Sequence, residues 1–160
     1  MPEYVLKLLL AALLLSIAYS DLRQRHITLL QVLLLGALSV ALATRAGWPL
    51  LWRQALFNTA FLLTQFLLLW AWFSFRERRP ARLFEHYIGL GDLLFLLAIT
   101  PVFPLRHFIW FYTLSALLVL LLALLLKWLR PQAFDTIPLA GGLACCFLIY
   151  LLLEKQLPAF

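Results

Sequence analysis

Six apolar stretches, separated by short connections that carry charges or prolines, dominate this chain of 160 residues. They cover roughly residues 4–20, 27–44, 54–75, 88–103, 108–126 and 137–153. Hydrophobic residues make up 65% of the chain and charged residues 12%, whereas a soluble domain is about half apolar and about a quarter charged. One small core cannot cover so much apolar surface, so lipid must be the solvent. We therefore expect an all-α fold, a polytopic transmembrane helical bundle of about six spans.

The lengths of the stretches add detail to this expectation. A spanning helix needs about 17–25 residues, so the stretch 88–103 is short, and Pro101 and Pro104 favour a kinked or re-entrant end. The first stretch is interpreted as a retained span because five more follow it. The connections leave no room for another domain, so residues 1–160 are expected to form a single membrane-embedded domain. All six tryptophans lie near the end of a stretch, where an indole ring suits the membrane interface: Trp48, Trp52, Trp70, Trp72, Trp110 and Trp128.

The distribution of basic residues predicts an orientation. Connections one, three and five carry eight Lys and Arg residues: Arg23, Arg25, Arg76, Arg78, Arg79, Arg82, Lys127 and Arg130. The other side carries five: Lys7, Arg45, Arg53, Arg106 and Lys155. The positive-inside rule places the richer side in the cytoplasm and both termini outside. The chain is thus expected to be a multi-pass protein of the inner (cytoplasmic) membrane.

Several functional classes are disfavoured by the composition. The net charge of +6 is explained by attraction of basic loops to anionic lipid headgroups, and no soluble domain is present to bind nucleic acid. Cys145 and Cys146 are adjacent and are interpreted as small apolar residues rather than a disulfide or a zinc site. No His-Glu-x-x-His or Gly-x-Ser-x-Gly motif is present, so neither a metal ion nor a serine nucleophile is expected. No cofactor is expected.

Two aspartates are the best candidates for chemistry. Asp92 follows Gly89-Leu90-Gly91 at the start of the fourth stretch, and Asp21 ends the first stretch. An ionisable group beside hydrocarbon is costly and marks a functional site by default. The structural alternatives are an Asp21 ion pair with Arg23 or Arg25, and Asp92 as a helix cap.

Other residues are interpreted around these two. Gly89 and Gly91 allow backbone to approach the Asp92 carboxylate closely, and Glu85 is a candidate for the entrance of the site. Asp135, followed by Pro138, is interpreted as the start of the last helix. Gly141 and Gly142 are expected to let that helix pack closely on a neighbour.

A close pair of carboxylates keeps one proton between them, because both cannot ionise cheaply. The ionised member can then take a proton from water, while the protonated member polarises a carbonyl group. Such a pair hydrolyses an amide without a metal. Because hydrolysis requires water, a position at the membrane border suits this chemistry.

These residues resemble a known family. Asp21 after the first span, Gly89-Leu90-Gly91-Asp92 at the fourth, and Ile137-Pro138-Leu139-Ala140-Gly141 at the last are similar to motifs of the type IV prepilin peptidases, the GxGD aspartyl proteases. The resemblance implies a catalytic pair of Asp21 and Asp92, and cleavage of prepilin-like precursors at the cytoplasmic face, between a basic leader and an apolar helix.

The chain departs from that family in places. Ile27-Thr28-Leu29 stands where members usually have Ile-Pro-Asn, and Leu94 stands where many have lysine. The cysteine-bearing region of bifunctional members is absent from the sequence, so peptidase activity without methyltransferase activity is expected. Two alternatives remain: a catalytically silent relative that acts as a binding or scaffold protein, and a small proton-coupled transporter that uses the same acids as a relay.

Overall fold

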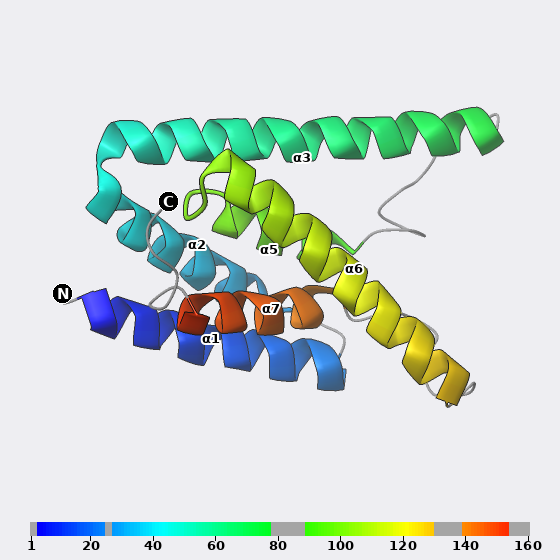
Figure 1. Cartoon of the computed structure of the whole chain (residues 1–160), viewed down its shortest axis with the longest axis horizontal. Helices are drawn as coiled ribbons and strands as arrows, with labels where there is room; N and C mark the ends of the chain where they lie inside the picture. Colours follow the sequence, from blue (N-terminus) through cyan, green and yellow to red (C-terminus); the bar gives the residue numbers. More distant parts are fainter. Residues whose placement is uncertain (1–2, 25–26, 78–88, 130–138, 154–160) are drawn as a thin grey trace.

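The computed structural model describes residues 3–24, 27–77, 89–129 and 139–153, and within these ranges the regular structure is helical. The elements are α1 (Glu3–Gln24), α2 (Leu29–Ala43), the 3-10 turn η1 (Thr44–Ala46), α3 (Trp48–Glu77), α5 (Leu90–Ile99), α6 (Leu105–Leu129) and α7 (Leu139–Leu153). Consecutive helices run in opposite directions, so the start of α1 and the end of α7 lie at the same end of the bundle (Figure 1). The predicted all-α class is confirmed.

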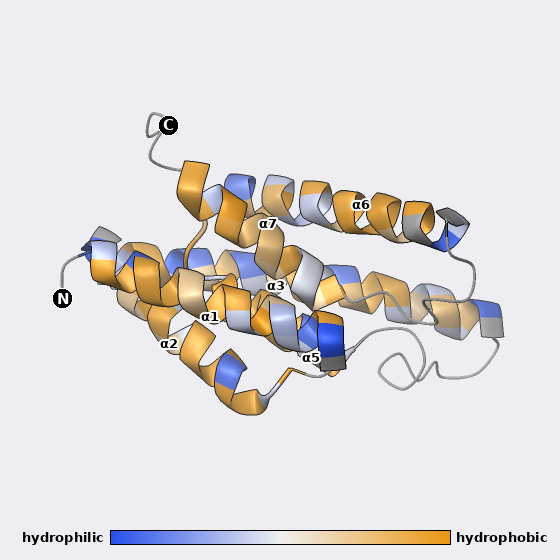
Figure 2. Ribbon diagram, turned by 90° about the horizontal axis from the view of Figure 1, so that it is seen from below, coloured by the Kyte–Doolittle hydropathy of each residue, from blue (hydrophilic) through white to orange (hydrophobic). Residues whose placement is uncertain are grey.

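Three of these helices are long and apolar enough to cross a membrane: Glu3–Arg23, Trp48–Arg76 and Leu105–Leu125. The other three, α2, α5 and α7, are apolar but shorter. Apolar residues line most of the helix lengths, and polar residues gather mainly toward helix ends (Figure 2). The apolar helices thus indicate a membrane protein. The number of six spans and the location of both termini on the outer side of the membrane remain predictions.

The start of α3 and the end of α5 differ from the sequence-based expectation. α3 begins at Trp48 instead of residue 54, because Pro49 lies in the first helical turn, where no N–H is required, and Arg53 is exposed. The fourth stretch yields a helix of 10 residues that ends at Ile99, just before Pro101. Such a helix is about 15 Å long, about half the thickness of a hydrocarbon core.

An aromatic cluster forms the centre of the bundle. Phe95, Phe103, Phe108 and Phe147 are fully buried, and the Phe103 ring stacks on Phe111 with centroids 5.0 Å apart. Around this cluster α1 packs on α7 and α2, α2 packs on α5, and α6 packs on α7 and α3. The core therefore fixes the short helix α5 between longer neighbours.

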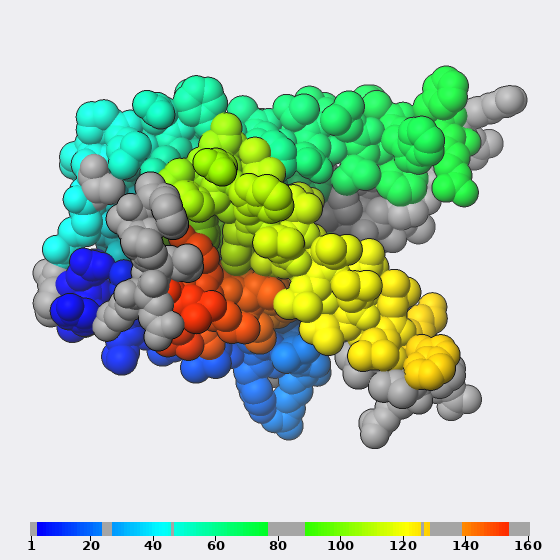
Figure 3. All heavy atoms as spheres, viewed as in Figure 1, coloured from blue at the N-terminus to red at the C-terminus, as the bar shows by residue number. Residues whose placement is uncertain are grey.

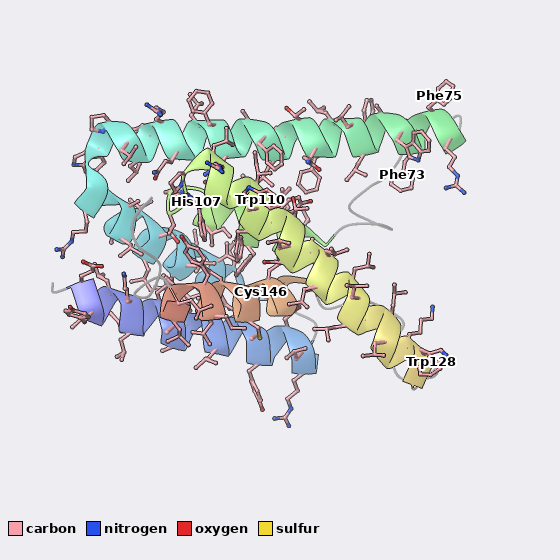
Figure 4. The ribbon with its side chains drawn as sticks, in the orientation of Figure 1. Phe73, Phe75, His107, Trp110, Trp128 and Cys146 are labelled. Carbon is pink, nitrogen blue, oxygen red and sulfur yellow. The ribbon has the colours of Figure 1, made fainter. Side chains whose placement is uncertain are left out.

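The far ends of α3 and α6 leave this core. The two helices diverge toward their C-terminal ends (Figure 3), where Phe75 points away from the bundle and Trp128 lies at the end of α6 (Figure 4). Both side chains are highly exposed, as are most large apolar residues of α3 and α6. Exposed apolar surface of this extent suits contact with lipid.

Candidate active site

Asp21 lies near the C-terminal end of α1, where it is buried with 7% of its surface exposed. Its Oδ2 atom accepts a hydrogen bond of 2.6 Å from the backbone N–H of Gly141, in the first turn of α7. Among the described residues no ion pair joins Arg23 to Asp21; the Arg23 guanidinium donates to the hydroxyl of Tyr19 and lies over that ring. The structure therefore does not show the Asp21–Arg23 ion pair of the alternative interpretation, and Arg25 lies outside the described residues.

Asp92 lies in the first turn of α5, whose N-cap is Gly89 with an extended backbone. Its Oδ1 atom accepts a hydrogen bond of 2.9 Å from the backbone N–H of Ala140. The carboxylate also receives a backbone hydrogen bond from Gly89, so Asp92 combines a local contact at its own helix start with a contact to α7.

The first turn of α7 thus brings the two aspartates together. The first N–H groups of a helix have no partner within the helix, and here two consecutive ones, from Ala140 and Gly141, donate to different carboxylates. Because consecutive backbone nitrogens are less than about 4 Å apart, the two accepting oxygens lie within about 9.5 Å of each other. The charge of Asp21 acts on Asp92 across this gap, and the positive end of the α7 dipole faces both.

Two glycines create the space for these contacts. A Cβ atom on Gly141 would lie 3.0 Å from Oδ2 of Asp21, and one on Gly89 would lie 3.0 Å from Oδ2 of Asp92. Gly91 differs, since its Cβ would make an ordinary contact of 3.4 Å with Ile27. Gly89 therefore lies close to the Asp92 carboxylate, while Gly91 lies against Ile27.

Gly142 faces the other side of α7. Its Cβ would lie 2.3 Å from Cγ2 of Val119 on α6, so α6 passes directly over this turn. Gly141 meets α1 in the same way, with Ala18 and Asp21 as neighbours. The prediction that Gly141 and Gly142 allow close packing of the last helix is confirmed.

The start of α2 packs against the Gly-Leu-Gly-Asp turn through the contact of Ile27 with Gly91. Thr28 is the N-cap of α2, and its side-chain oxygen accepts a hydrogen bond from the backbone N–H of Gln31. In turn, the side-chain oxygen of Gln31 accepts a hydrogen bond from the backbone N–H of Thr28. The Gln31 side chain also donates to the hydroxyl of Ser16 on α1 over 3.0 Å. Thr28 therefore caps the start of α2, and the neighbouring Ile27 lies against Gly91.

Some sequence-predicted residues cannot be compared with the structure. Glu85, Asp135 and Pro138 lie outside the described residues. Within the described ranges no group of three or more His, Cys, Asp or Glu side chains comes close enough to hold a metal ion. The described residues place at this site a pair of carboxylates and the helix start whose amides contact them.

Sequence reasoning missed two contributors. The amides of Ala140 and Gly141 were not identified as donors, although the run Pro-Leu-Ala-Gly-Gly signals a helix start with free N–H groups. Asn58 on α3 was also missed, and it is fully buried against the turn that follows α5. A lone asparagine within a long apolar stretch is the signal that could have revealed it.

Comparison with known proteins gives one match. The family model of the type IV leader peptidase family matches residues 8–126, which include both aspartates. No curated protein and no solved structure matches the chain.

Proposed function

The chain belongs to the type IV leader peptidase family, and on this premise we propose that it is a membrane aspartyl endopeptidase acting on prepilin-like precursors. Asp21 and Asp92 form its catalytic pair, and cleavage separates a leader peptide from the apolar helix that follows it. The observation that carries the proposal is the meeting of both carboxylates on consecutive amides of α7, over 2.6 and 2.9 Å.

The proposed mechanism uses the two carboxyl groups in different protonation states. One carboxylate removes a proton from a water molecule as the water oxygen attacks the carbonyl carbon of the scissile bond. The protonated partner donates to the carbonyl oxygen, which gives a tetrahedral gem-diol. The carbon–nitrogen bond then breaks as the nitrogen receives a proton from the pair. The products are a leader with a free carboxyl group and a mature chain with a free amine.

The structure supports such a division of roles. Each carboxylate accepts one hydrogen bond from an α7 amide, and carboxylate oxygens have further lone pairs that can accept from water or substrate. The two amides restrain the orientation of both side chains before the substrate arrives, which lowers the entropy lost at the transition state. Desolvation around the partly buried pair strengthens every electrostatic interaction in the site.

The proposed site faces the cytoplasm. This placement rests on the excess of Lys and Arg in connections one, three and five, and within the described residues Arg23, Arg76 and Lys127 lie at the corresponding helix ends. A substrate helix in the bilayer then presents its leader junction at the depth of the pair. Glu85 is proposed to lie at the entrance and to offset part of the repulsion between the arginine cluster and a basic leader.

The test is replacement of each aspartate by its neutral isostere. Purified Asp21→Asn and Asp92→Asn, reconstituted in liposomes with a prepilin-type precursor, are each expected to lose cleavage while remaining inserted and folded. Leu94→Asn, a change two residues from Asp92 on the exposed face of α5, is the matched control and should retain cleavage. Processing by either aspartate variant at the wild-type rate would refute the proposal, and would favour a silent scaffold protein.

A further inference from the structure

Among the described side chains of α3, few are buried, and Asn58 is the one buried residue that is polar. Leu51, Asn58 and Leu62 are its buried residues, and the surrounding α3 side chains are largely exposed. Asn58 lies about 15 Å from the start of the helix, within its apolar part. An amide at such a position is unfavourable unless its hydrogen bonds are made inside the protein.

The amide group of Asn58 bridges the break between α5 and α6. Its Nδ2 atom donates to the backbone carbonyl of Thr100 over 2.8 Å and to that of Phe103 over 2.7 Å. The Oδ1 atom has no partner within the described residues, so the side chain is oriented for its two N–H groups. Among short side chains only that of asparagine offers two donors from one nitrogen.

The two carbonyls need this donor. The last carbonyls of a helix have no partner within it, and the turn after α5 contains Pro101 and Pro104, which lack an N–H. Phe103 and Phe108 are fully buried around the turn. Water cannot easily satisfy the carbonyls in such surroundings, and Asn58 does so from the neighbouring helix.

The bridge acts on Asp92 through the short helix between them. α5 begins at Leu90 and ends at Ile99. The Asp92 carboxylate and the Asn58 hydrogen bonds therefore lie at opposite ends of a helix about 15 Å long. At the Asp92 end, α5 is held by the hydrogen bond from the Ala140 amide and by the contact between Gly91 and Ile27. If the other end is released, α5 is free to tilt or slide, and Asp92 moves with it.

We propose that Asn58 is a positioning residue for the aspartate pair, because it fixes the depth of α5 by holding both sides of the α5–α6 turn. The inference rests on the proposed function in that Asp92 must be correctly placed for cleavage. It concerns the geometry of α5 directly, however, so that geometry can be measured independently of any substrate.

The main variant is Asn58→Leu, which keeps the side-chain volume and removes both donors. We expect kcat for precursor cleavage to fall about 10- to 100-fold with KM changed less than threefold. Asn58→Gln, which keeps both N–H groups on a longer arm, should recover part of the loss. Thr64→Val is the matched control, because the Thr64 hydroxyl bonds the carbonyl of Ala60 in its own helix, and it should leave kcat unchanged.

A distance measurement separates this inference from the proposed function. Spin labels at Leu15→Cys on α1 and Leu94→Cys on α5, both exposed, report the α1–α5 distance in a background with Cys145 and Cys146 replaced by alanine. Asn58→Leu should broaden or shift the distribution by about 3 Å, the rise of two helical residues, and Thr64→Val should not.

The outcomes are distinct. An unchanged distance distribution in folded Asn58→Leu overturns the inference, as does a changed distribution with wild-type kcat. If the wild-type protein itself cleaves no precursor, the proposed function fails, and the distance measurement alone still decides whether Asn58 positions α5. Where Asn58→Leu does not fold, Asn58→Ser, which keeps a single donor, takes its place with the same two criteria.

Discussion

Replacement of Gly141 tests whether the α7 amides serve catalysis. A Cβ at this position would lie 3.0 Å from Oδ2 of Asp21, so the carboxylate must retreat by a few tenths of an ångström in Gly141→Ala. The present hydrogen bond of 2.6 Å then lengthens to about 3 Å, which is still a normal N–H···O distance. We therefore expect Gly141→Ala to slow cleavage less than tenfold.

Gly141→Val is expected to have a much larger effect. Its methyl groups extend into the volume of the Asp21 carboxylate, so the hydrogen bond is lost instead of stretched. A hydrogen bond to a charged group contributes about 1.5–3 kcal/mol, which corresponds to a rate loss of about 10- to 150-fold if the bond persists in the transition state. The series Gly, Ala, Val should thus give a graded decline.

Single-turnover cleavage in proteoliposomes, with enzyme in excess over a fluorescent precursor, measures this decline without interference from product release. Size-exclusion chromatography of each variant gives the folded fraction by which the rates are normalised. Gly142→Ala is the control for general helix packing, because its Cβ would collide with Val119 at 2.3 Å without touching either aspartate. Its thermal stability should fall, and the double variant with Val119→Ala should recover it.

Two results would contradict this reasoning. If folded Gly141→Val cleaves the precursor at the wild-type rate, the hydrogen bond between Asp21 and α7 is not part of the active arrangement. Equal rate losses in the Gly141 and Gly142 series, with equal recovery by Val119→Ala, would show that helix packing alone explains the glycines.

Three further predictions address the neighbours of the pair. Gly89→Ala should slow cleavage several-fold more than Gly91→Ala in the same assay, because only the former forces Asp92 to shift; equal rates would contradict this. Arg23→Gln should leave the cleavage rate within about threefold, since this guanidinium contacts Tyr19 and an exposed interaction contributes little; a loss above tenfold would place Arg23 in the site. Asp92→Asn should equal or exceed the wild-type protein in thermal stability at alkaline pH, where two adjacent carboxylates repel each other; a lower melting temperature there would argue against the close pair.

Much of the fold was predictable from the sequence because lipid exposure leaves a simple pattern. Apolar stretches of helical length revealed the all-α class, and Gly89, Gly91 and Asp92 marked the start of a helix beside a carboxylate. The start of α3 was harder to predict. Pro49 and Arg53 resemble a loop in sequence, but a first-turn proline and an exposed arginine are both compatible with helix.

The partners of the aspartates were less predictable. Backbone N–H groups are common to nearly every residue, so the identities of Ala140 and Gly141 do not indicate that their amides bind Asp92 and Asp21. That assignment depends on the relative placement of three helices. Asn58 is similar, because its role follows from the carbonyls of a turn that lies 42 residues away from it in the chain.

The placement of both acids on one helix start also limits their charge. The N-terminus of a helix carries roughly half a positive elementary charge, which favours one carboxylate but cannot neutralise two. Water is largely excluded around buried Asp21, so a second full negative charge at this place is unfavourable. The α7 amides bring Asp21 and Asp92 together and stabilise a carboxylate, whereas the mutual repulsion of two close carboxylates favours the singly protonated pair that the proposed hydrolysis requires.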